Sequence, residues 1–517
     1  MNKRIILFLL SVLFLSSCME DDSTYGNGSI YIDISGIEST YNVVSFSNDA
    51  LEINPEVTTS FDANDLEYEW SYAPSTSGST TTSSDSVIAT VISHEKVLDY
   101  ESRLSDGIYN FFFTVKSKST GYSQSKTTIV YAASALSKGF YILKENSEGN
   151  TDVDLWNTQQ QALLPDVLAN YGGSAIKGTP LHLDIIGNFS YLDSISGKPA
   201  SGPVLSITTQ STHDQRWIRI RDAKTVKTLA DCHYEPQTDE IPYRSVCSNQ
   251  TEFLITNNGI YTASAGYGIG TFGAAVYGTS GNEHATATNY YQLVFYNPQN
   301  HSLQSVDASG TTVSILNKLT DQTQMITYRP IYNYSQDIIF LGLNQLSYND
   351  AIVFAVSQST SDPNDRAVYS LKAGYSNISL TSVRVLDKSS HFANAAKYAI
   401  CGSQARLLYA IDGNKVYSLD LSNENSVEQP VSLPGIPEGE QITYIADKAP
   451  LGVTDAFDYL IIGTQQNGIY HVYFYNMTGG IPDGNPVFSI EGHGILRNVE
   501  YTDPVAAKVS GNNIIDD

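Results

Sequence analysis

The residues with the most specific chemistry stand near the start of the chain, where Cys18 closes a short apolar segment. Lys3 and Arg4 supply a positive start, residues 5–15 are apolar but too few to span a bilayer, and small residues precede the cysteine. This order predicts a signal peptide over residues 1–17, cleavage before Cys18 and acylation of its thiol. The alternative is an ordinary signal peptide that happens to contain a cysteine. Acyl chains would hold the mature protein on a membrane without crossing it.

An acidic run follows the predicted acylation site. Glu20, Asp21 and Asp22 come directly after Cys18 and Met19. An acidic run at this place resembles the surface-export signal of Bacteroidetes lipoproteins, and the resemblance implies a protein on the outer face of the outer membrane. The alternative is that the charges only keep a tether in solution. In both cases residues 18–29 are expected to form an acidic tether.

Three further cysteines could take part in redox chemistry. Cys232 and Cys247 flank a polar segment with prolines and could form a disulfide in an oxidising compartment. Two buried thiols in neighbouring strands are the other interpretation, and Cys401 is expected to be a small core residue. No C-x-x-C motif or Cys/His cluster with metal-ligand spacing occurs in the sequence, so we expect no metal site.

A glycine-rich segment carries three aromatic residues that could bind a ligand. Residues 268–273 match the G-x-G-x-x-G spelling of a dinucleotide loop, but no helix pattern follows them, which argues against that interpretation. Tyr267, Phe272 and Tyr277 instead predict a flexible loop whose rings stack on a sugar or hold a peptide side chain. Packing of these rings over the edge of a sheet is the alternative.

Motifs of known enzyme classes are lacking. The sequence contains neither H-E-x-x-H nor G-x-S-x-G. A glycosidase needs two carboxylates beside the bond it cleaves, but nothing singles out one pair among 54 acidic residues. The net charge of -25 argues against nucleic acid or anionic lipid as the main partner. We therefore expect a protein without catalytic residues or a cofactor.

Strand patterns predict an all-β chain whose first domain is a sandwich. Short strands separated by polar turns fill residues 30–133 and are typical of an antiparallel immunoglobulin-type sandwich. Residues 66–72 alternate strictly between apolar and polar types, which places Trp70 in the core between the sheets and Ser71 outside. The inward face of that strand carries Leu66, Tyr68, Trp70 and Tyr72.

A hairpin unit recurs in the second domain, over residues 138–517. Residues 253–261, 407–417 and 459–470 each contain an apolar run, a turn with Asn-Gly or Asp-Gly, and a second run ending in tyrosine. Such turns between apolar runs are strong hairpin signals, and their recurrence predicts a β-propeller-like domain. At about 40 to 50 residues per blade, the domain would hold roughly seven or eight blades. A larger sandwich with long insertions is the alternative.

Two strand motifs of the first domain resemble the polycystic-kidney-disease (PKD) type of immunoglobulin-like module. The motif residues are Tyr68, Glu69, Trp70, Gly107, Ile108 and Tyr109. Together with the Cys18 segment and residues 138–145, they resemble the PKD-like lipoprotein family of Bacteroidetes. The resemblance implies a surface lipoprotein that works beside an outer-membrane importer of the SusC/SusD type.

Taken together, these patterns predict a lipid-anchored binding protein of the outer membrane. It would capture a glycan or peptide as a nutrient, or serve as an accessory subunit of a SusC/SusD-type importer. One alternative is a surface glycoside hydrolase or lyase with a carboxylate pair in the funnel of the propeller. Another is a structural or adhesive surface protein without a small ligand.

Overall fold

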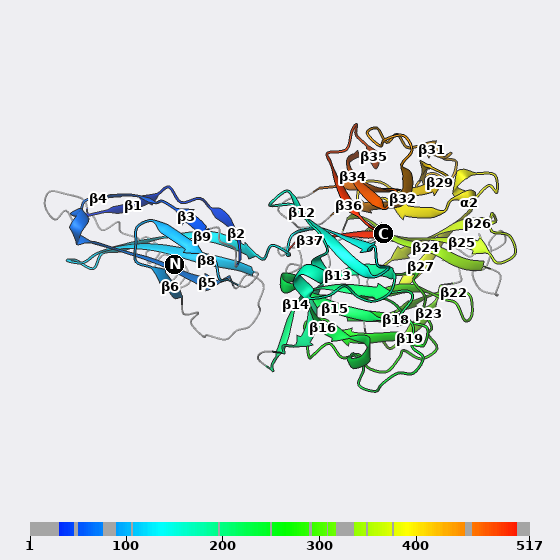
Figure 1. The fold of residues 1–517 in the computed structure, drawn as a ribbon, viewed down its shortest axis with the longest axis horizontal. Helices are drawn as coiled ribbons and strands as arrows, with labels where there is room; N and C mark the ends of the chain where they lie inside the picture. Colours follow the sequence, from blue (N-terminus) through cyan, green and yellow to red (C-terminus); the bar gives the residue numbers. More distant parts are fainter. Residues whose placement is uncertain are drawn as a thin grey trace, which may run out of the picture.

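The computed structural model shows an all-β chain with a sandwich beside a ring of sheets (Figure 1). It describes residues 30–45, 50–75, 89–104, 107–194, 197–248, 251–288, 292–307, 309–316, 336–347, 350–374, 377–449 and 457–503. The predicted acylation and export residues, Cys18, Glu20, Asp21 and Asp22, lie outside the described residues. Within these ranges no helix is long and apolar enough to cross a membrane.

The sandwich packs one large sheet against two short strand pairs. The large sheet has the order β2 (Thr40–Val44), β9 (Ser123–Ala133), β8 (Gly107–Ser117), β5 (Leu66–Pro74) and β6 (Thr90–Ser93). The short pairs are β1 (Ile32–Ser35) with β4 (Glu56–Thr59), and β3 (Ala50–Ile53) with β7 (Leu98–Glu101). Residues of both layers share one hydrophobic core.

Trp70 occupies the centre of this core, as its strand pattern predicts. Its side chain is fully buried, its ring centroid lies 4.6 Å from that of Phe113, and its indole N–H donates to the carbonyl of Lys96 at 3.2 Å. The register is correct for Leu66 and Trp70, but Ser71 is buried rather than exposed. A bulge between Trp70 and Ser71 in the pairing with β6 breaks the strict alternation there.

Seven sheets of the described residues form the blades of a propeller. Blade 1 consists of β37 (Ile495–Thr502), β10 (Gly139–Glu145), β11 (Thr151–Asn157) and β12 (Ala162–Leu164). Blade 2 consists of β13 (Pro180–Leu192), β14 (Pro199–Thr209), β15 (Gln215–Arg219) and β16 (Lys224–Thr228). Blade 3 consists of β17 (Pro242–Cys247), β18 (Thr251–Thr256) and β19 (Gly259–Ser264). Blade 4 consists of β20 (Ala285–Ala287), β21 (Leu293–Asn297), β22 (Ser302–Val306) and β23 (Val313–Ile315). Blade 5 consists of β24 (Gln336–Ser347), β25 (Asp350–Ser359), β26 (Arg366–Ala373) and β27 (Ile378–Val385). Blade 6 consists of β28 (Lys397–Ile400), β29 (Leu407–Asp412), β30 (Lys415–Asp420) and β31 (Gln429–Pro430). Blade 7 consists of β32 (Gln441–Lys448), β33 (Tyr459–Gln466), β34 (Ile469–Thr478) and β36 (Phe488–His493). In blade 7, β35 (Ile481–Pro482) also pairs with β34.

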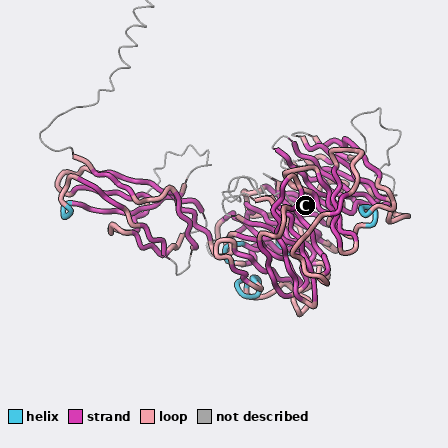
Figure 2. The backbone as a smooth tube through the Cα atoms, turned by 90° about the horizontal axis from the view of Figure 1, so that it is seen from above, coloured by secondary structure: helices cyan, strands magenta, loops and turns pink. Residues whose placement is uncertain are grey.

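The predicted hairpin units are confirmed as strand pairs within the blades. They are β18 with β19, β29 with β30, and β33 with β34. Strands dominate both parts of the chain when it is seen from above (Figure 2). The short helical turns are η1 (Ala63–Asp65), η2 (Leu168–Gly172), η3 (Ile220–Asp222), η4 (Leu229–Asp231) and α2 (His391–Asn394).

The first strand of each blade lies at the axis, and neighbouring first strands contact one another around a closed ring. Hydrogen bonds join matching ends of these inner strands. The N–H of Gln345, in β24, donates to Gly402, which follows β28, and the N–H of Gly402 donates to Asp447, in β32. The inner strands therefore run in one direction. We call the face at which they begin the top face.

Each interface between neighbouring blades holds one hydrophobic core. The seven cores join blades 1 and 2, 2 and 3, and so on around the ring to blades 7 and 1. Successive side chains of β10 point to opposite faces of its sheet, so one strand contributes to two cores. Tyr141 and Leu143 pack in the core shared with blade 2, whereas Phe140 and Ile142 pack in the core shared with blade 7. A blade strand is therefore buried on both faces.

Replacing Trp70 with Ala should destabilise the sandwich by about 3 to 5 kcal/mol, because it empties a large aromatic site in a core. Chemical denaturation of the purified protein should show an earlier transition for the sandwich and an unchanged transition for the propeller. The control is Val91→Ala, at an exposed position of β6. Equal stability of the two variants would mean that Trp70 is not a core residue.

Candidate functional site

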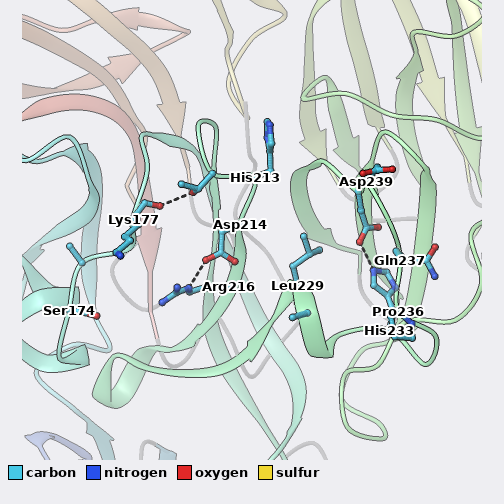
Figure 3. A pocket seen from close by; sticks show the side chains of 14 residues that line it. Ser174, Lys177, His213, Asp214, Arg216, Leu229, His233, Pro236, Gln237 and Asp239 are labelled. Atoms are coloured by element: carbon cyan, nitrogen blue, oxygen red, sulfur yellow. Dashed lines mark hydrogen bonds and ion pairs between the residues drawn. The ribbon is translucent and has the colours of Figure 1, made fainter.

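A polar pocket opens on the top face between blades 2 and 3 (Figure 3). Its volume is about 840 Å³. Three connections form its walls: the turn before β13, the turn between β14 and β15, and the segment between β16 and β17. Strand β14 ends beside the start of β13, since Pro180 pairs with Thr209. Because β15 and β16 continue the antiparallel order, β16 ends at the same face, and all three connections lie there. The lining residues are Ser174, Ala175, Lys177, Thr212, His213, Asp214, Arg216, Leu229, Ala230, His233, Pro236, Gln237, Asp239 and Glu240.

Polar contacts hold two of these connections together on one side of the pocket. The Thr212 hydroxyl donates to the carbonyl of Lys177 at 2.8 Å, which joins the first two connections. Beside them, Arg216 Nε forms an ion pair with Asp214 Oδ2 at 2.8 Å. Both charged side chains are partly exposed, so they can also contact a ligand.

The opposite wall contains a buried pair, His233 and Glu240. His233 Nε2 lies 2.9 Å from Glu240 Oε2, and each side chain is 4% exposed. The His233 ring packs 4.5 Å from the ring of Tyr261, whose hydroxyl donates to Gln237 Oε1 at 3.3 Å. Burial, and then the charge of Glu240, raises the pKa of Tyr261 to about 12. These contacts fix the segment between β16 and β17 on blade 3.

The pocket offers hydroxyl, amide, imidazole, carboxylate and guanidinium groups, and its volume is in the range of small-ligand sites. It is therefore suited to a polar ligand with several hydrogen-bonding groups. Among the residues with described positions, no group of three or more His, Cys, Asp and Glu side chains is placed to hold a metal ion. His213 and Asp214, which the sequence presents only as neighbours, both line the pocket.

The structure corrects the prediction that Phe272 is displayed on a flexible loop. Phe272 is fully buried, and its ring packs 5.8 Å from Trp217 in the core between blades 2 and 3. Its N–H donates to the carbonyl of Cys232 at 2.7 Å. Residues 272–276 follow β19 by hydrogen bonds to Thr262 and Ile260, in the place of a fourth strand. The edge-covering alternative therefore holds for this residue.

Tyr267 and Tyr277 are exposed as predicted, at 80% and 97%. They lie at opposite ends of the segment that follows β19, because Tyr267 comes soon after Ser264 whereas Val276 pairs with Ile260 at the start of β19. The two rings therefore do not form one platform. Neither residue lines the pocket.

A further exposed aromatic residue, Tyr234, lies between pocket residues His233 and Pro236. It is 75% exposed, and its N–H donates to the carbonyl of Phe272. Sequence reasoning missed it, as it missed most of the pocket. The available signal is the run of polar residues between two apolar strands, which marks many surface connections equally.

The structure shows no disulfide between Cys232 and Cys247, and both side chains are buried thiols, as the alternative interpretation expects. Both lie in the core between blades 2 and 3, but each points to a nearby carbonyl: Cys232 to Leu229 at 3.2 Å, and Cys247 to Ser248 at 2.8 Å. Burial raises the pKa of both thiols, so they are poor nucleophiles. Cys401 is also buried and free, as expected.

Glu252 connects the two blades beneath the pocket. It accepts hydrogen bonds from Trp217 Nε1 of blade 2 at 2.9 Å and from Ser245 Oγ of blade 3 at 3.0 Å. The side chain is 1% exposed. Burial raises the pKa of Glu252 to about 8, although both hydrogen bonds oppose the shift. The carboxyl group is thus largely protonated at neutral pH.

Residues 18–180 match the PKD-like family. The match includes the sandwich, continues through β10, β11 and β12 of blade 1, and ends at the start of β13. The PKD-like assignment is therefore confirmed for this part of the chain. No curated protein sequence matches the chain.

Several solved structures are similar to the chain at low sequence identity. A quinonprotein alcohol dehydrogenase-like protein from Bacteroides thetaiotaomicron is 10% identical, with a TM-score of 0.40, covering 90% of this chain and 96% of that one. The Dos1 propeller is 12% identical, with a TM-score of 0.35 and coverages of 70% and 78%. Apo AztD from Citrobacter koseri is 11% identical, with a TM-score of 0.34 and coverages of 70% and 96%.

Replacing Glu252 with Gln should remove one source of pH-dependent stability. The folded state retains a proton that the unfolded chain, with an ordinary pKa of 4.5, releases. The stability of the wild type should therefore fall as the pH rises from about 4.5 to about 8. Relative to the Gln variant, the loss between pH 5 and pH 8 should be roughly 2 to 4 kcal/mol.

Urea denaturation at both pH values measures this difference. Glu148→Gln, at an exposed turn of blade 1, is the control and should follow the wild type. Parallel pH dependence of the wild type and Glu252→Gln would show that Glu252 is ionised in the folded state.

Proposed function

We propose that this chain is a lipid-anchored, surface-exposed protein of the outer membrane that binds a polar nutrient ligand without transforming it. The ligand class is a glycan or a peptide. The observation that supports the proposal most directly is the pocket of about 840 Å³ between blades 2 and 3. Its walls are connections mounted on closed, doubly buried blades, an arrangement that favours a preformed binding site.

The anchoring part of the proposal comes from the sequence of the first 29 residues. Cys18 is the acylation site, and Glu20, Asp21 and Asp22 form the export signal. In this proposal the PKD-like sandwich is the spacer between the anchor and the propeller. The chain would work beside a SusC/SusD-type importer, either delivering its ligand or acting as an accessory subunit.

The hydrolase or lyase alternative has little support in the propeller funnel. Glu283 and Glu500 are the only carboxylates among the described residues that line the central channel. Glu500 forms an ion pair with Lys448 at 3.0 Å, whereas burial raises the pKa of Glu283 against the opposing charges of Arg244 and Lys397, so the two groups do not act as a pair. A glycosidase needs one carboxyl group as acid and another as base or nucleophile. A purely adhesive role does not require a pocket of about 840 Å³.

Replacing Glu20, Asp21 and Asp22 with Ala should retain acylation but move the protein to the inner side of the outer membrane. Protease treatment of whole cells measures the exposed fraction, which should fall strongly in this variant. Cys18→Ala is the companion variant and should incorporate no labelled palmitate. Unchanged protease sensitivity would refute the export signal, and labelling of Cys18→Ala would refute the acylation site.

Filling the pocket should abolish binding without unfolding the protein. Ala230 is exposed on the pocket wall, in η4, so Ala230→Trp should occupy the space that a ligand needs. The control is Ala63→Trp, an exposed position in the corresponding type of turn, η1, of the sandwich. Binding is measured on glycan and peptide arrays with the purified lipoprotein, followed by titration of each hit.

Loss of binding in Ala230→Trp alone is the expected result. Full binding by this variant would move the site elsewhere on the chain. A Tyr267→Ala, Tyr277→Ala double variant then tests the exposed edge of blade 3, with Phe272 left intact because it is a core residue. If the array yields no ligand but an importer co-purifies, the accessory role replaces capture.

A further inference from the structure

The central channel of the propeller carries an excess of positive charge. Its cavity has a volume of about 490 Å³, and every blade contributes to its lining. The basic lining residues are Arg244, Arg366, Lys397, Lys448 and Arg497, and the acidic ones in the described part of the lining are Glu283 and Glu500. This excess stands out in a chain whose net charge is -25.

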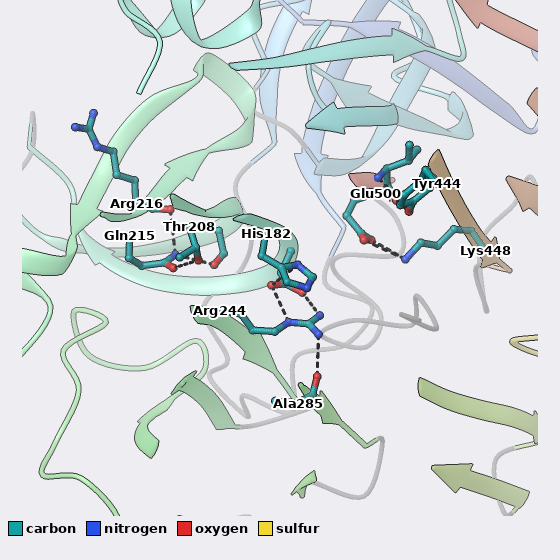
Figure 4. A network of polar contacts seen from close by, with 12 residues as sticks. His182, Thr208, Gln215, Arg216, Arg244, Ala285, Tyr444, Lys448 and Glu500 are labelled. Carbon is teal, nitrogen blue, oxygen red and sulfur yellow. Dashed lines mark hydrogen bonds and ion pairs between the residues drawn. The ribbon is translucent and has the colours of Figure 1, made fainter. Parts of the chain in front are cut away.

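Three of the five basic groups already have carboxylate partners. Arg244 Nε lies 3.2 Å from Asp184 Oδ2, and its Nη1 donates to the carbonyl of Ala285 (Figure 4). Lys448 Nζ lies 3.0 Å from Glu500 Oε2 in the same view. Arg497 Nη2 lies 3.0 Å from Glu145 Oε2. These contacts fix the wall but leave two cations to be explained.

Arg366 is a buried guanidinium group that is held by neutral oxygens. The residue is 8% exposed and begins β26. Its Nε donates to the carbonyl of Pro363 at 2.9 Å, and its Nη1 donates to the carbonyl of Ala395 and the hydroxyl of Tyr398, both at 2.7 Å. Its Nη2 makes no hydrogen bond to any residue whose position is described. The contacts orient the planar group but do not neutralise it.

Lys397 lines the same cavity as Arg366. It is the first residue of β28 and follows Ala395, which accepts a hydrogen bond from Arg366, by two positions. Its ammonium group forms no hydrogen bond or ion pair with the described residues, and it is accessible from the channel. Enclosure by the channel wall lowers the pKa of Lys397, and Arg497 lowers it further while Glu283 opposes the shift.

Two histidines add further polar groups to the wall of the cavity. His182 and His284 both line the cavity. Burial, and then His182 and Arg244, lowers the pKa of His284 to about 4. A neutral imidazole can donate or accept a hydrogen bond at physiological pH. The described lining of the cavity is thus polar, with five basic and two acidic side chains.

We propose that the channel binds an oxyanion, the carboxylate, phosphate or sulfate group of a small acidic ligand, between Arg366 and Lys397. The planar guanidinium matches such groups through paired hydrogen bonds, and the ammonium adds a compact charge. A cavity lined mainly by charges of one sign concentrates their field on the bound group. The cavity of about 490 Å³ has room for a molecule of the size of a sugar acid.

This site is separate from the pocket between blades 2 and 3. The two cavities share no lining residue. The oxyanion could therefore be a second ligand, or an acidic group on a ligand that enters the channel alone. Its test does not depend on finding the nutrient.

Titration of the purified, full-length lipoprotein in non-ionic detergent tests the proposal. The probes are sulfate, phosphate and galacturonate, with neutral galactose as the blank and sodium chloride used to hold the ionic strength constant. At least one oxyanion should bind with saturation and 1:1 stoichiometry. The strongest of the three identifies the chemical source of the group.

Lys397→Gln should weaken this binding at least about tenfold, because it removes a charged hydrogen-bond donor that has no partner among the described residues. The matched control is Lys415→Gln, an exposed lysine that likewise begins a strand of blade 6, which should change affinity less than about twofold. Arg366→Lys keeps the charge but loses the planar fork, so it should also weaken binding. If Arg366→Lys does not fold, Lys397→Gln decides the question alone.

Saturable binding that Lys397→Gln reduces and Lys415→Gln does not would support the site. The absence of saturable binding, or equal effects of the two lysine variants, would overturn it. Ala230→Trp, which fills the pocket between blades 2 and 3, should leave oxyanion binding unchanged. Failure of the nutrient proposal and failure of the channel proposal are thereby distinguished.

Discussion

The pairing of β10 with β37 is the contact on which the propeller depends. It joins the two ends of the domain in antiparallel register, from Gly139 with Thr502 to Glu145 with Ile495, and it supplies blade 1 with its inner strand. An open ring would expose two sheet edges and two half-cores at once. Closure is therefore a condition for all seven blades, because each core is shared with a neighbour.

Polar contacts strengthen the same closure. Lys144, in β10, forms ion pairs with Asp154 at 2.6 Å and Asp166 at 2.8 Å. Asp154 also accepts a hydrogen bond from the hydroxyl of Tyr470, which belongs to blade 7. Such a buried network tolerates little displacement of its members. A rigid ring of blades supports the connections that line the pocket and the inner strands that line the channel.

Local patterns in the sequence reveal the strands but not how distant segments meet. Hairpin signals such as residues 253–261 predict the propeller and its seven or eight blades, and alternation predicts the burial of Trp70. Phe272 could not be placed correctly, because a glycine-rich segment gives no sign that it substitutes for a strand. Whether Cys232 and Cys247 form a disulfide depends on the direction of their side chains, which spacing alone does not determine.

The channel shows most clearly what sequence reasoning cannot reach. Arg366 and Arg497 are single residues on different blades, and only ring closure brings them to one cavity.

An anion that approaches the channel meets charges of opposite sign outside and inside it. A surface with a net charge of -25 repels an anion at a distance, whereas the channel attracts it nearby. Salt screens charges separated by more than about 10 Å at 0.1 M, so it weakens the outer repulsion more than the contact inside. Moderate salt should thus ease the approach of the anion, and selectivity would come from the short-range geometry of the Arg366 fork rather than from long-range attraction.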